Sequence, residues 1–152
     1  MKLRAEEVRE MIALAQARGE RLDLHGKDLS DLGLYKADLQ GADLRDADLT
    51  SVNLAGADLG GADLSRATLM QAEVSKAHLS GAKLRMANVT RANFVQANLR
   101  DADLREAHLV GANFRHADLT GADLTGARFD KYTRWSVDFD PEAVGAVLVV
   151  TT

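Results

Sequence analysis

Residues 37–64 read ADLQGADLRDADLTSVNLAGADLGGADL, and this stretch decides the fold. The chain repeats every five residues, and the same frame can be followed from Leu22 to Lys131 as 22 units. In most units Ala and Leu stand two positions apart. Residues two positions apart on an extended chain share one face, so both side chains can point into a core. The repeat therefore predicts short extended segments with an apolar inner face.

The five-residue period excludes an α-helix for this region. Five residues advance an α-helix by about 500°, which would spread the leucines over every side. A continuous strand fails as well, because Ala47 comes three residues after Leu44 and would point outward. A turn in every unit keeps both inside, so we expect the chain to coil, with backbone hydrogen bonds running between successive coils.

The number of units in each coil follows from the packing of the centre. Four converging leucines can fill it, whereas three would crowd and five would leave a void. When every fourth unit is compared, one set of final repeat positions is nearly all Gly, namely Gly41, Gly61, Gly81, Asp101 and Gly121. Because parallel crossover connections are nearly always right-handed, we expect an all-β solenoid: a right-handed quadrilateral parallel β-helix of about 5.5 coils over residues 22–131.

The same four-unit spacing predicts which core residues stack. Most departures from Leu fall in one column, which comprises Leu34, Leu54, Val74, Phe94 and Phe114. The small Val74 stands next to the first large Phe94, which is typical of compensation in volume between neighbours.

Both ends of such a fold need a cover, because open strand edges invite association. Residues 1–21 are expected to form an N-terminal capping helix that stops at Gly19, with apolar residues at helical spacing: Val8, Met11, Ile12 and Ala15. Residues 132–152 are expected to form a C-terminal cap in which Asp140-Pro141 starts a short helix. Its apolar residues are Trp135, Phe139, Val144, Val147 and Leu148. This cap could instead be a dimer surface, so monomer and homodimer both stay open.

Composition excludes several classes of site. The 152 residues contain no Cys, which rules out disulfides and zinc-thiolate centres. The segment 1–21 lacks the apolar run of a signal peptide, so a cytoplasmic location is expected. The four histidines have no metal-ligand spacing, and a convex rod offers no pocket to separate the pKa values of a carboxylate pair. We therefore predict no enzyme, no cofactor and no metal site.

Charge is distributed in bands along the chain. Residues 22–65 carry a net charge of −6, residues 66–100 a net charge of +5, and residues 101–131 a net charge of −2. The basic band also contains two outward methionines. A patch for a protein partner is one interpretation, and its members would be Arg66, Met70, Lys83, Arg85, Met86 and Arg91. The other interpretation is an ordinary solvated surface of mixed charge.

Outward carboxylates raise a second possibility. An acidic face containing Asp38, Asp43, Asp58 and Asp63 could imitate the phosphates of a nucleic acid duplex. Short polar residues at this position are also explained by the turns, because they hydrogen-bond nearby backbone. The basic band interrupts the acidic surface, which counts against a long duplex mimic.

The Ala-Asp/Asn-Leu-x-x pattern, which covers about 110 residues, resembles the pentapeptide-repeat family. The segment from Phe139 to Val149 is similar to the tail that closes many cyanobacterial members. The resemblance implies the β-helix and a non-catalytic role; some members bind DNA gyrase as duplex mimics. We thus expect a non-enzymatic protein-binding scaffold of unknown partner, with a gyrase-binding DNA mimic as the alternative. Direct binding to nucleic acid or membrane is not expected.

Overall fold

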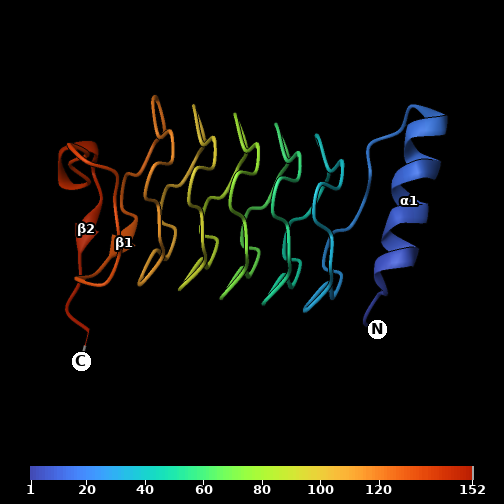
Figure 1. Ribbon diagram of the computed structural model, residues 1–152, viewed down its shortest axis with the longest axis horizontal. Helices are drawn as coiled ribbons and strands as arrows, with labels where there is room; N and C mark the ends of the chain where they lie inside the picture. Colours follow the sequence, from blue (N-terminus) through green and yellow to red (C-terminus); the bar gives the residue numbers. More distant parts are fainter. Residues whose placement is uncertain (152) are drawn as a thin grey trace.

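The computed structural model describes residues 1–151, and its chain winds into a stack of coils (Figure 1). Helix α1 (Ala5–Arg18) stands at one end of the stack. The other end carries strand β1 (Arg128–Phe129), the 3-10 helix η1 (Glu142–Val144) and strand β2 (Val147–Leu148). Among the described residues no helix combines the length and apolar character needed to cross a membrane.

Successive coils pair in parallel, and each paired residue meets its equivalent four units further along the chain. Asp23 is bridged to Asp43, and Asp43 to Asp63. Four such columns run along the stack, and their first repeat residues are Asp23, Asp28, Gly33 and Asp38. Each bridge involves a single residue, so within residues 1–151 only β1 and β2 form regular strands. The expected parallel pairing is present, but long strands are not, because the chain turns in every unit.

Backbone hydrogen bonds of two kinds build each coil. The N–H of Leu24 donates to the carbonyl of Asp43 in the next coil at 2.8 Å. Within a coil, the N–H of Ala42 donates to the carbonyl of Leu39 at 3.0 Å and closes a turn. The third residue of this turn, Gly41, has φ 69°, as a type II turn requires.

The inner face of the coils forms one continuous apolar core of Ala and Leu. The predicted aromatic column is confirmed, because Phe94 and Phe114 are fully buried and their rings stack at 5.1 Å. Trp135 extends this column and stacks on Phe114 at 5.0 Å. Side chains of matching shape therefore repeat from coil to coil down the centre.

The N-terminal helix is confirmed, and it spans Ala5–Arg18 rather than the whole of residues 1–21. Lys2 is bridged in parallel to Asp28 and so adds an extended segment to the first coil. Val8 and Ile12 are buried against the core, while Met11 and Ala15 are partly buried. Gly19 ends the helix with φ 63°. Helix α1 thus covers the apolar end of the stack.

The C-terminal segment continues the coil-to-coil pairing beyond Lys131, where the sequence frame ends. Asn113 is bridged to Arg134, whereas the repeat frame would pair it with Thr133, so the register shifts by one position. Strand β2 then pairs in parallel with β1.

The apolar residues of this segment divide into two groups. Trp135 and Phe139 pack against the core as the sequence predicts. The sequence also places Val144, Val147 and Leu148 among the covering residues, but they are 40–53% exposed. The backbone of β2 therefore supplies the last rung, with its side chains turned largely to solvent.

Candidate functional site

The outward Asp residues serve the turns that follow them. The Oδ1 atoms of Asp38 and Asp58 accept hydrogen bonds from the backbone N–H of the second residue after each, at 3.2 and 3.0 Å. Asp43 and Asp63 make the same contact at 3.2 and 3.0 Å. One carboxylate oxygen of every residue in the predicted acidic face is therefore engaged by the backbone.

These four carboxylates do not form one surface. Asp43 and Asp63 are neighbours in one column, and Asp38 and Asp58 are neighbours in the next. The Arg45 guanidinium also grips Asp43 with two hydrogen bonds of 2.6 and 2.9 Å. The side-chain hydrogen bonds from Arg45 hold the pKa of Asp43 well below its usual range. The charge of Asp43 in the predicted acidic face is thus neutralised by Arg45, a residue of the same coil.

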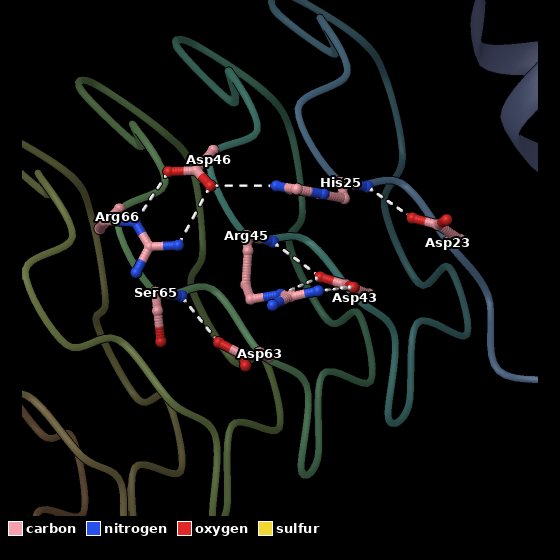
Figure 2. A network of polar contacts seen from close by, with 8 residues as sticks. All are labelled: Asp23, His25, Asp43, Arg45, Asp46, Asp63, Ser65 and Arg66. Atoms are coloured by element: carbon pink, nitrogen blue, oxygen red, sulfur yellow. Dashed lines mark hydrogen bonds and ion pairs between the residues drawn. The ribbon is translucent and has the colours of Figure 1, made fainter.

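The column that contains Asp43 is the most heavily charged, and we call it the charged face. It comprises Asp23, His25, Asp43, Arg45, Asp46, Asp63, Ser65, Arg66, Lys83, Arg85, Met86, Asp103, Arg105, Glu106 and Asp123. Figure 2 shows the coils nearest α1, where Asp46 lies between His25 and Arg66. Hydrogen bonds from Arg66, and then from His25, lower the pKa of Asp46.

An Asp-x-Arg pairing recurs on this face and is interrupted in the middle. Arg105 grips Asp103 with bonds of 2.7 and 2.9 Å, in the same way that Arg45 grips Asp43. In the two coils between these pairs, the corresponding residues are Asp63 with Ser65, and Lys83 with Arg85. Asp63 therefore has no arginine two residues after it, and Arg85 has no carboxylate two residues before it. The Arg85 guanidinium instead donates a hydrogen bond to Glu106 at 3.3 Å.

A groove of about 390 Å³ lies where the Asp-x-Arg pairing is interrupted, and we call it the middle groove. Its lining residues are Arg45, Asp63, Ser65, Arg66, Lys83, Arg85, Met86, Asp103 and Arg105. Met86 is 47% exposed and gives the groove an apolar contact.

The structure brings together four of the six residues of the patch proposed from the sequence. Arg66, Lys83, Arg85 and Met86 line the middle groove. Met70 is exposed but belongs to the next column of the stack, which starts at Asp28. Arg91 lies in a separate hollow at the C-terminal end.

That second hollow, the C-terminal groove, has a volume of about 580 Å³. Its lining residues are Arg91, Val110, Gly111, Asp130, Lys131, Tyr132, Arg134 and Thr151. All but Arg91 are missing from the residues singled out in the sequence. The loss of the five-residue frame after Lys131 is the signal that could have pointed to them.

Across residues 1–151, no three side chains of His, Asp or Glu gather closely enough to hold an ion. His25 is the one histidine on the charged face, and its Nε2 lies 3.0 Å from a carboxylate oxygen of Asp46, which also accepts hydrogen bonds from Arg66.

These features define a repeat protein whose coils pair through single residues and whose outward side chains form charged columns. The family model for pentapeptide repeats matches the chain in 8 copies, over residues 20–50, 28–66, 47–85 and 97–131. The chain therefore belongs to the pentapeptide-repeat family.

Several solved structures match the chain. The pentapeptide repeat protein Rfr23 from the cyanobacterium Cyanothece 51142 is 26% identical, and the match covers 81% of this chain and 96% of that one with a TM-score of 0.74. The protein alr5209 from Nostoc PCC 7120 is 31% identical over 92% and 93%, with a TM-score of 0.36. The plasmid-mediated fluoroquinolone resistance protein QnrB1 is 21% identical over 86% and 90%, with a TM-score of 0.37. No curated protein sequence matches the chain.

Proposed function

We propose that the chain is a right-handed quadrilateral β-helix that acts as a non-enzymatic scaffold and binds a protein partner through the charged face. The hand is supported by the strong bias of parallel crossovers and by the likeness to Rfr23. The observation that carries the binding proposal is the middle groove, where the Asp-x-Arg pairing is interrupted.

The interruption leaves binding capacity that the neighbouring coils lack. Arg45 and Arg105 are fixed by carboxylates of their own coils. Of the five cations that line the middle groove, Lys83 alone makes no ion pair within residues 1–151. Lys83 and the exposed Met86 together fit a partner segment that carries a carboxylate close to an apolar side chain.

Capture from a lysate of the cells that make this protein tests the proposal. The wild-type chain and Lys83→Glu are used as baits, with Lys76→Glu as the control because Lys76 is also exposed but lies on another column. We expect the wild type and the control to retain a partner that Lys83→Glu loses. A partner retained equally by all three baits would remove the middle groove from the proposal.

Mimicry of a DNA duplex that binds gyrase is less well supported by the geometry. Lys83 follows Asp63 in one column, and His78 follows Asp58 in the next, so each acidic run is broken. In a supercoiling assay with purified gyrase, with and without a quinolone, we expect the chain to have no effect. Inhibition or protection from the drug would instead make the acidic residues the site.

A further inference from the structure

The C-terminal groove forms where the repeat register changes. Arg134 takes the place beside Asn113 that the repeat frame would give to Thr133, so one extra residue is accommodated in the preceding turn. That turn contains Lys131 and Tyr132. Tyr132 is 57% exposed. Apart from Tyr132 and Tyr35, every aromatic ring in the described part of the chain is buried or half-buried. The change of register therefore places an aromatic ring on the surface beside a hollow.

The floor of this groove is a fixed carboxylate. Asp130 is only 2% exposed, and it accepts hydrogen bonds from the N–H of Gly111 at 3.1 Å and the hydroxyl of Thr151 at 2.6 Å. In the preceding coil the corresponding N–H of Arg91 donates to a backbone carbonyl at 2.9 Å. The Asp130 side chain thus takes over a backbone contact, and its donors partly offset its charge.

The walls of the groove are cationic. Its three cations, Arg91, Lys131 and Arg134, are exposed and make no ion pair within residues 1–151. A Cβ atom at Gly111 would stand 3.1 Å from Cγ of Arg91, so the absence of a side chain there gives the arginine stem room against the coil. The Lys131 ammonium lies 5.1 Å from the centre of the Tyr132 ring.

We propose that the C-terminal groove binds a small ligand that carries both phosphate and a planar ring, the chemical class of a nucleoside diphosphate. Guanidinium and ammonium groups suit phosphate oxygens, and those of the C-terminal groove make no ion pair within residues 1–151. The exposed Tyr132 ring offers a surface on which a planar ring can stack. The volume of about 580 Å³ falls within the range of small-molecule sites, roughly 300–1,000 Å³.

The middle groove does not offer the same chemistry, because four of its five cations are already held by carboxylates. This comparison supplies the control for the test. Arg85 in the middle groove is exposed and can be changed without touching the C-terminal groove. The proposed ligand site is also independent of the protein-binding proposal, because the two concern different grooves.

Isothermal titration calorimetry on the full chain tests the site with ADP and inorganic pyrophosphate as probes. We expect both probes to bind, and Arg91→Gln and Arg134→Gln each to weaken both about tenfold or more. Tyr132→Ala should weaken ADP about fivefold or more and leave pyrophosphate within about twofold, because only ADP has a ring to stack. Arg85→Gln should change neither affinity.

Thermal unfolding of each variant shows whether the fold is kept, and exposed substitutions of this kind should leave the melting temperature nearly unchanged. Three results would overturn the proposal. They are the absence of binding heat with both probes at millimolar concentration, an equal loss of affinity in Arg85→Gln, and much tighter binding of a single-stranded oligonucleotide than of ADP. The last result would assign the surface to nucleic acid strands.

Discussion

Gly33 and Gly81 differ in backbone conformation, although a Cβ atom would meet nothing within 4 Å at either site. Gly81 has φ 68°, in the left-handed region that side chains disfavour, whereas Gly33 does not have a positive φ. Gly81→Ala should therefore lower the free energy of unfolding by about 1 kcal/mol. Gly33→Ala should raise it by about 0.4–1 kcal/mol, because it restricts only the unfolded chain. Urea titrations measure both, and equal shifts would contradict this account of the turn.

The buried carboxylate of Asp130 makes stability depend on pH. Burial alone would raise the pKa of Asp130, but hydrogen bonds from Thr151, Gly111 and other donors outweigh it and lower the pKa. The stabilising contribution is then present above the unfolded value of about 3.9 and is lost as pH falls through the lower folded value.

Asp130→Asn removes this charge and should lower the free energy of unfolding at pH 7 by about 1–3 kcal/mol. The difference between wild type and variant should shrink below about pH 4, because the carboxyl of the unfolded chain then takes up a proton before that of the folded chain, whose pKa is lower. Unfolding titrations at neutral pH and near pH 2 measure it. A constant difference across this range would show that the charge of Asp130 plays no part.

Residue by residue, the sequence predicts the inner face well and the outer face less well. Inward positions repeat with a strict period, so Phe94 and Phe114 could be placed in one column. Many outward side chains are long, and each can form an ion pair or hydrogen bond with any of several neighbouring residues. Arg85 and Arg105 have the same repeat position, but only Arg105 has a carboxylate in its own pair. The pairing of Arg85 with Glu106 in the next coil is the kind of contact that the sequence could not predict.

Among the elements, helix α1 contributes to stability through the few residues that meet the core. Val8 is fully buried, whereas Leu14 on the same helix is 50% exposed. Val8→Ala should lower the free energy of unfolding by about 2 kcal/mol, because it removes buried methyl groups and leaves a cavity. Leu14→Ala is the matched control and should stay within about 0.5 kcal/mol of wild type. Similar effects of both substitutions in denaturant titrations would mean that α1 does not cover the stack as described.

The C-terminal elements show where sequence periodicity stops being informative. Once the frame ends at Lys131, nothing in the pattern indicates that one extra residue is absorbed before Arg134 and that the pairing then resumes. Trp135 could be recognised as apolar, but its place on top of Phe114 depends on that register change. The C-terminal groove has the same origin, which is why all of its residues except Arg91 escaped the sequence analysis.

The whole molecule depends on one uninterrupted core, so a single charge at its centre should unfold it. Leu84 lies in the middle of the stack and is fully buried, and Leu84→Asp would place a carboxylate where no partner is available. We expect loss of the cooperative thermal transition. Asp58→Asn is the control, because an Asn side chain can still accept the hydrogen bond from the N–H of Gly60. Near-equal melting temperatures for the two variants would contradict the continuous core.

The four-unit register also governs how such a chain can change its length. An insertion of four units restores every column and lengthens the stack by one coil. An insertion of one unit would keep Ala and Leu inside but rotate everything downstream by a quarter turn about the long axis. Arg91 and Lys131 share one column across two coils, and such an insertion between them would aim them at adjacent sides. The number of units between two residues therefore sets the angle between their side chains about the long axis. The gain of a single unit would separate the residues of a surface site and leave the packing of the core intact.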